Sequence, residues 1–166
     1  MEERPVITLR LKTTDKIFEI MGWLSIIAIW GLTITNYTNL PDIIPTHYDG
    51  KGQVDGSGNK ATILTLPIIA TLLFVVLTII NRYPHIFNFM TNITKNNAFR
   101  QYTLATRTIR YLKLVIVIIF GLITFKTIQN ANGQEEGLGI WFLPQMLGLI
   151  FIPMTYFLIK SFKTKQ

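Results

Sequence analysis

Long stretches without a charged residue constrain the fold of this chain more than any other feature. Three of them, of 22, 21 and 23 residues, lie between Glu19 and Asp42, between Lys60 and Arg82, and between Glu136 and Lys160. A helix needs about 20 apolar residues to cross the roughly 30 Å hydrocarbon core of a bilayer. Each stretch is therefore long enough to span a membrane. The composition agrees, since 49% of the 166 residues are hydrophobic and only 15% are charged.

A fourth apolar stretch, residues 111–129, is interrupted by Lys113 near its start and Lys126 near its end. Between them, Leu114 to Phe125 carry no charge. Lysine side chains can extend along apolar surface until the ammonium reaches the membrane interface. We therefore interpret this stretch as a span whose two lysines reach the interfaces, in preference to a buried helix of a soluble domain.

The sequence predicts an all-α membrane protein, a bundle of four transmembrane helices with both chain ends on the same side. A small ordered extracytoplasmic loop, compatible with a hairpin, follows the first helix. We interpret the first span as an uncleaved signal anchor, since no convincing cleavage site follows it. The whole chain, 1–166, is expected to form one domain. Its expected spans are residues 17–38, 61–81, 111–129 and 138–160, joined by external loops 39–60 and 130–137 and a cytoplasmic loop 82–110.

The basic residues predict the orientation. Lysine and arginine in short loops stay in the cytoplasm. Three basic residues, Lys51, Lys60 and Lys126, fall on the side of the first loop. The other thirteen of the 16 basic residues fall on the opposite side, which predicts cytoplasmic termini in a bacterial cytoplasmic membrane. They are Arg4, Arg10, Lys12, Lys16, Arg82, Lys95, Arg100, Arg107, Arg110, Lys113, Lys160, Lys163 and Lys165.

The net charge of +7 is accounted for by this topology and by anionic lipid headgroups. The basic residues are spread over three membrane-flanking segments and are not interleaved with aromatic residues, as they are in many nucleic-acid-binding proteins. We therefore expect no nucleic-acid partner.

Two acidic residues begin the first span. Asp15 is expected to be the N-cap, and Glu19 to stabilise the positive end of the helix. The alternative for Glu19 is a functional carboxylate that faces the bundle interior. Trp23 and Trp30 lie a heptad apart on one face, which indicates packing against neighbouring helices.

The cytoplasmic loop and the last span carry further local signals. Residues 96–113 are expected to form an interfacial helix with Arg100, Arg107 and Arg110 on its wet face. Pro144 and Pro153 lie inside the fourth span, where we expect a kink and not an end of the helix.

The external loop contains most of the residues that could bind a ligand or a metal. Its sequence is LPDIIPTHYDGKGQVDGSGNKA. Its Asp-Gly pairs are strong turn signals, and the segments around them can pair as a small hairpin. The segment that begins at Asp55 imitates a calcium loop but has Lys60 where that loop needs glycine and Leu66 where it needs glutamate. His47, Asp49 and Asp55 could ligate a transition metal, or His47 could be a hydrogen-bonded structural residue in an ordered lid.

The loop pattern resembles a widespread bacterial membrane domain of unknown function, found at the amino-terminal end of SdpI-type immunity proteins. The residues that carry the resemblance are Leu40, Pro41, Asp42, Ile44, Pro45, His47, Gly52, Asp55, Gly56 and Lys60. Two further segments resemble stand-alone members of this family. One consists of Arg82, Tyr83, Pro84 and His85, and the other runs from Gly137 to Pro144. The resemblance implies protection against a secreted peptide toxin, but the chain is too short to hold the further membrane domain of those proteins.

These observations favour a binding or interaction protein over an enzyme. Its partners would be the lipid bilayer, a peptide toxin or another membrane protein, and a second copy of the chain, with no cofactor. The expected contact residues are Pro41, Asp42, Pro45, His47, Asp49, Gly52, Asp55, Gly56 and Lys60. Two alternatives remain open, a metal-dependent membrane hydrolase and a small transporter or channel component.

Overall fold

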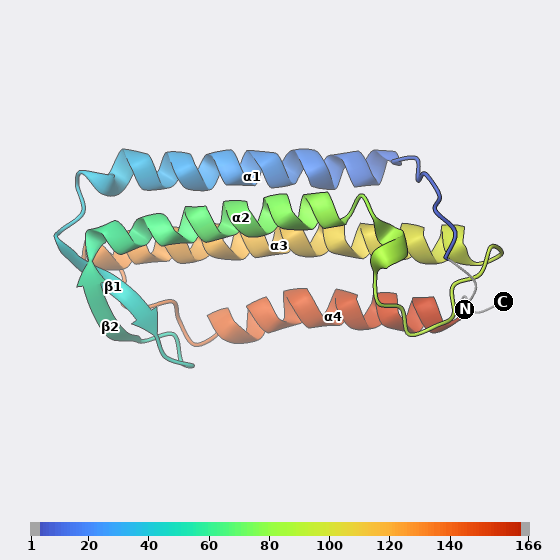
Figure 1. Ribbon diagram of the computed structural model, residues 1–166. Coiled ribbons are helices and arrows are strands. Elements are labelled where there is room, and N and C mark those ends of the chain that lie inside the picture. Colours follow the sequence, from blue (N-terminus) through green and yellow to red (C-terminus); the bar gives the residue numbers. More distant parts are fainter. Residues whose placement is uncertain (1–3, 164–166) are drawn as a thin grey trace.

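The computed structural model describes residues 4–163 and contains four long helices (Figure 1). Each is long and apolar enough to cross a membrane, which makes the chain a candidate four-span helical membrane protein, as predicted. A two-stranded hairpin lies between the first two helices and confirms the expectation for this loop. The elements are α1 (Thr13–Tyr37), β1 (Ile43–Tyr48), β2 (Val54–Asn59), the 3-10 helix η1 (Lys60–Leu64), α2 (Thr65–Ile80), the 3-10 helix η2 (Pro84–Ile86), α3 (Ala98–Ala131) and α4 (Phe142–Lys163).

The two ends of the bundle differ in what they carry. The hairpin lies at one end, while the arm before α1, the η2 loop and the end of α4 lie at the other (Figure 1). This arrangement matches the grouping of basic residues made from the sequence, except that Lys165 lies outside the described residues. Which end faces the cytoplasm remains a prediction from the charges.

The core lies among α1, α2 and α3. One apolar cluster in the middle of the bundle consists of Ile26, Ile29, Ala70, Phe74 and Val117. A second cluster lies under the hairpin and consists of Leu40, Ile44, Ile63 and Ile128. The hairpin therefore has an apolar base of its own and is not an isolated loop.

A glycine brings α1 and α2 together. A Cβ at Gly22 would lie 2.3 Å from Cε2 of Phe74, a ring that is 1% exposed. Small residues allow this close approach in membrane helices. The two tryptophans of α1 pack as predicted, since Trp23 meets the Phe74 ring edge-on and Trp30 Nε1 donates a 3.0 Å hydrogen bond to Thr71 Oγ1.

The start of α1 corrects one expectation. Lys12 is the N-cap, and Asp15 is the third residue of the helix. Its carboxylate accepts a 2.9 Å hydrogen bond from the Lys12 amide and so satisfies one of the free N–H groups at this helix end. Asp15 therefore stabilises the helix start from inside the helix.

Helix α3 corrects another. The face of residues 96–113 that was expected in water is partly buried. From Ala98 onward these residues are helical and lead into the third span, as expected, within one continuous helix, Ala98–Ala131, of 34 residues, about 51 Å long at 1.5 Å per residue. Its first half packs into the bundle, with Tyr102 fully buried and Arg110 only 8% exposed. The buried face includes Thr106, and Arg110, which was expected in water, contributes to the interior.

Helix α4 is the peripheral element. Among its described residues only Met146 is buried. Tyr111 of α3 donates a 2.9 Å hydrogen bond to the Leu149 carbonyl. The helix begins at Phe142, four residues after the expected start of the span, because Gly137 and Gly139 have positive φ angles of 79° and 86° that interrupt helical geometry. It continues through Pro153, as expected.

Candidate functional site

The hairpin is fixed to the rest of the molecule at its base and at its turn. Ile44 is 1% exposed in the apolar cluster beneath β1. At the turn, the Leu138 amide donates a 2.6 Å hydrogen bond to the Gly52 carbonyl. A Cβ at Gly52, whose φ is +77°, would lie 2.6 Å from the Gly139 carbonyl oxygen. Only glycine fits this crossing of two backbones, so the loop before α4 holds the hairpin turn in place.

Polar contacts also join β1 to α3. The Tyr48 hydroxyl lies 2.9 Å from Thr127 Oγ1, and Asn130 Nδ2 donates to the same hydroxyl at 3.2 Å. At the other end of the strand, Lys60 forms a 3.1 Å ion pair with Asp42. The hairpin is therefore an ordered platform on the bundle end.

The predicted metal ligands do not converge. His47 Nδ1 lies 2.5 Å from Asp55 Oδ1 across the two strands, and both side chains are largely exposed. Asp49 instead accepts hydrogen bonds from the amides of Lys51 and Gln53, both at 2.8 Å, and closes the turn. Within residues 4–163, no group of three or more His, Asp or Glu side chains could hold a metal ion.

The other predicted residues of this loop build the hairpin or lie beside it. Pro45 pairs with Ser57 in the strand register, and Gly56 faces His47, whose Cβ would be 3.0 Å from an added Cβ. Pro41 lies just before β1 and is exposed. The motif residues thus form the hairpin itself, with His47 and Asp55 presented on its surface.

The outer edge of β2 has free backbone groups. The Lys60 amide donates to the Asp42 carbonyl at 2.9 Å, so these two residues form a hydrogen-bonded pair. The antiparallel alternation makes Ile44 and Gly58 the next such pair and turns the N–H and C=O of Ser57 away from β1. Ser57 is exposed. An edge of this kind can accept another extended segment.

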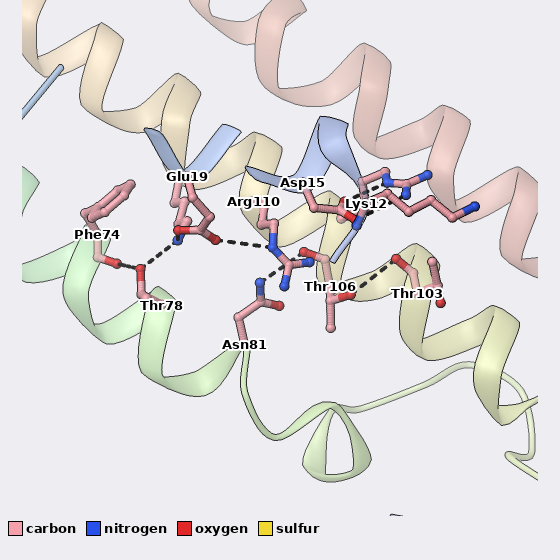
Figure 2. A network of polar contacts seen from close by, with 11 residues as sticks. Lys12, Asp15, Glu19, Phe74, Thr78, Asn81, Thr103, Thr106 and Arg110 are labelled. Carbon is pink, nitrogen blue, oxygen red and sulfur yellow. Dashed lines mark hydrogen bonds and ion pairs between the residues drawn. The ribbon is translucent and has the colours of Figure 1, made fainter. Parts of the chain in front are cut away.

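A second candidate site, which the sequence analysis missed, lies inside the opposite half of the bundle (Figure 2). Lys113 has no exposed side-chain surface, and its ammonium lies 2.6 Å from both Glu19 Oε2 and Thr78 Oγ1. It also lies 4.4 Å from the centre of the Phe74 ring. Lys113 therefore does not extend to the interface, and Glu19 faces the bundle interior, which was the less favoured of its two interpretations.

Two arginines extend this ionic cluster. Arg110 Nε lies 3.2 Å from Glu19 Oε1, and Arg107 Nε lies 2.9 Å from Asp15 Oδ1. The cluster thus links α1 to α3, with Thr78 of α2 as the third wall. Burial of such charges is tolerated only when they are paired and hydrogen-bonded.

A signal for this cluster exists in the sequence. Asp15 and Glu19 are four residues apart, and Arg107, Arg110 and Lys113 are three apart, so each set lies on one helical face. Two faces of opposite charge on two different helices indicate an interhelical contact. The sequence analysis assigned Arg107 and Arg110 to a water-exposed face and therefore did not pair them with the acidic residues of the first helix.

The motif that was predicted to be cytoplasmic lies near the ionic cluster and far from His47. Arg82 and Tyr83 lie in the turn after α2, and Pro84 and His85 begin η2. Arg4 donates hydrogen bonds to the carbonyls of His85 and Phe87, at 3.2 and 2.6 Å, and so holds the N-terminal arm against this turn. The structure therefore separates the predicted residues into two groups at opposite ends of the bundle.

Comparisons with known proteins match part of the chain. Residues 24–71 match DUF1648, a domain of unknown function, and include most of α1, the hairpin and the start of α2. An uncharacterized protein of Archaeoglobus fulgidus is 29% identical over 96 residues, which cover 51% of this chain and 52% of that protein. The match thus spans about half of the relative's length. No solved structure matches. The resemblance to a membrane domain of unknown function is confirmed, while the relation to SdpI-type proteins remains a prediction.

Proposed function

We propose that this four-span protein is a membrane-bound binding module without enzymatic activity, and that its hairpin recognises an extended peptide outside the cytoplasm. The observation that carries the proposal is the free edge of β2 on a rigid base. Because both strands are fixed to η1, α3 and the loop before α4, the edge is ordered before a partner arrives.

The chemistry of the edge favours a peptide strand. Gly56, Ser57 and Gly58 leave the backbone accessible, since their side chains are absent or short. A peptide that adds as a third strand would take main-chain hydrogen bonds from this edge. His47 and Asp55, beside it, offer polar contacts to side chains of the peptide. In such binding, contacts to a few side chains of the peptide would distinguish one peptide sequence from another.

The biological role that fits this binding is immunity to a secreted peptide toxin, in the bacterial cytoplasmic membrane. The resemblance of the loop to SdpI-type proteins supports this role, and the positive-inside distribution of charge supports an external hairpin. The motif residues from Leu40 to Lys60 all belong to the segment that matches DUF1648.

The test uses a sensitive bacterial host that expresses the protein and is challenged with a panel of secreted antimicrobial peptides. Ser57→Pro removes the outward N–H, whereas the matched control Ser57→Ala keeps it. We expect wild type and Ser57→Ala to protect against at least one peptide and Ser57→Pro to protect at least tenfold less, at equal membrane level and equal thermal unfolding midpoint.

Two results would overturn this proposal. Equal protection by Ser57→Pro and wild type would mean that the edge is not the binding surface. No protection against any peptide, together with no crosslink from a photoreactive residue at Ser57 to any of them, would remove the immunity role. A loss of protection in His47→Ala would show that His47 and Asp55 make polar contacts to the peptide.

Transport is a second candidate function, favoured by the ionic cluster among three candidate spans. Ionisable side chains inside membrane bundles frequently mark ion or proton pathways. A proteoliposome assay with a trapped pH-sensitive dye tests it. Proton flux above that of empty liposomes, reduced in Glu19→Gln, would favour transport over simple binding.

A further inference from the structure

The half of the bundle that contains the ionic cluster also contains a cavity of about 650 Å³. The N-terminal arm covers one side, and the turn after α2 closes another. Glu19, Asn81, Arg82, Thr106 and Arg110 contribute polar surface to its wall.

The charges around this cavity do not balance. Asp15 is paired with Arg107, and the single carboxylate of Glu19 is shared between Lys113 at 2.6 Å and Arg110 at 3.2 Å. Glu19 is the one acidic residue among those that line the cavity. The two carboxylates therefore face three cations, and Arg82 on the wall adds a fourth. The cavity has an excess of positive charge.

Two buried polar groups on the wall lack hydrogen-bond partners. Arg110 is 8% exposed, and its Nε has no hydrogen bond despite its ion pair with Glu19. Asn81 is 6% exposed; its Nδ2 donates to the Thr106 carbonyl at 3.1 Å, but its Oδ1 has no donor (Figure 2). Unsatisfied polar groups at this depth cost free energy. A ligand that accepts from arginine and donates to the amide oxygen would satisfy both atoms.

The length of α1 predicts that the cavity lies near one boundary of the hydrocarbon core, where the headgroups begin. Helix α1 has 25 residues, about 37 Å at 1.5 Å per residue, which exceeds a hydrocarbon core of about 30 Å. Glu19 is the seventh residue of this helix, so we expect the cavity wall near the boundary between hydrocarbon and headgroups. Phosphate groups are the abundant anions at this depth, and arginine binds them through two parallel N–H groups.

We propose that this cavity binds a phosphate group that also carries a hydrogen-bond donor. Arg110 and Arg82 bind the phosphate oxygens, and Asn81 Oδ1 accepts from a hydroxyl of the ligand. Two sources share this chemistry, the headgroup of an anionic phospholipid and a soluble phosphate.

The experiment uses the full chain purified in detergent and in nanodiscs. Arg110→Gln and Arg82→Gln remove the two cationic contacts, and Arg82 is exposed, so its variant tests the site without disturbing packing. Arg100→Gln is the matched control, because Arg100 is exposed, lies outside the cavity wall and loses the same charge. Binding of inorganic phosphate is measured by calorimetry, and retention of phosphatidylglycerol against phosphatidylcholine by mass spectrometry.

We expect binding about tenfold weaker in Arg82→Gln and Arg110→Gln and unchanged in Arg100→Gln, since a charged hydrogen bond contributes enough to change affinity by this factor. Selective retention of phosphatidylglycerol that phosphate does not displace would assign a lipid headgroup. Saturable binding of inorganic phosphate would assign a soluble ligand. The proposal is overturned if neither binds, or if all three arginine variants weaken binding equally, which would indicate general attraction to a basic surface.

Discussion

At the scale of single residues, Glu19 is the side chain on which the buried ionic cluster depends. It is the carboxylate partner of fully buried Lys113 and of Arg110. Removal of one partner from a buried ion pair leaves an uncompensated charge, which costs more than the pair itself contributes. Local charge, more than apolar area, therefore decides how α1 meets α3 at this depth.

We predict that Glu19→Gln lowers the free energy of unfolding by about 3–5 kcal/mol. Thermal unfolding in detergent, followed by tryptophan fluorescence, measures it. Glu135→Gln is the control, because Glu135 pairs with Lys126 on a partly exposed surface, where such pairs contribute about 0–1 kcal/mol. The double variant Glu19→Gln/Lys113→Met should recover the part of the loss that comes from Lys113, while Arg110 stays without its carboxylate. Equal effects of the two single variants would contradict a buried, coupled pair.

At the scale of elements, the hairpin and the loop before α4 form one unit. The Leu138 amide bonds to the Gly52 carbonyl, and a Cβ at Gly137 would lie 2.1 Å from that same oxygen. Neither segment can keep its place if the other moves. The order of the proposed peptide-binding edge therefore depends on a contact between segments that are more than eighty residues apart.

We predict that Gly137→Ala breaks this contact and increases hydrogen exchange at the Leu138 amide and in β2. The control is Gly133→Ala, since Gly133 also has a positive φ, +69°, but an added Cβ would meet nothing within 4 Å. Both variants incur a backbone cost of about 1 kcal/mol, and only Gly137→Ala adds the clash. Equal exchange in the two variants would show that the contact does not hold the hairpin.

At the scale of the whole molecule, the two candidate sites lie at opposite ends of a bundle of four candidate spans. The hairpin would face a peptide on one side of the membrane, while the cavity would face phosphate at the other. Helix α4 leaves most of its apolar surface uncovered, which suits contact with lipid or with a second copy of the chain. The orientation of the bundle decides which side each site serves.

The orientation can be measured directly because the chain contains no cysteine. We predict that a cysteine at Ser57 reacts with a membrane-impermeant thiol reagent in intact cells, whereas a cysteine at Asn96 reacts only after lysis. Both positions are exposed, so access to the reagent depends on the side of the membrane alone. Labelling of Asn96 but not of Ser57 would invert the topology.

The sequence alone determined how many long helices the chain forms, that a hairpin follows the first of them, and that both ends of the chain lie on one side. These features follow from local pattern, since an uncharged run of about 20 residues has few folds open to it and Asp-Gly pairs favour turns. Gly137 before α4 illustrates the limit. The positive φ angles of Gly137 and Gly139 delay the start of α4 to Phe142, because the conformation of a glycine depends on the segment that it contacts.

Only the tertiary structure decided where the charges of α1 and α3 lie. Lys113 near a helix end could extend to the interface or turn inward, and both choices agree with its sequence neighbours. The inward choice becomes favourable only when Glu19 and Thr78, on two other helices, arrive within 2.6 Å. A buried charge is stabilised by partners that are remote in sequence, so the energy that selects its position does not exist until the helices have packed.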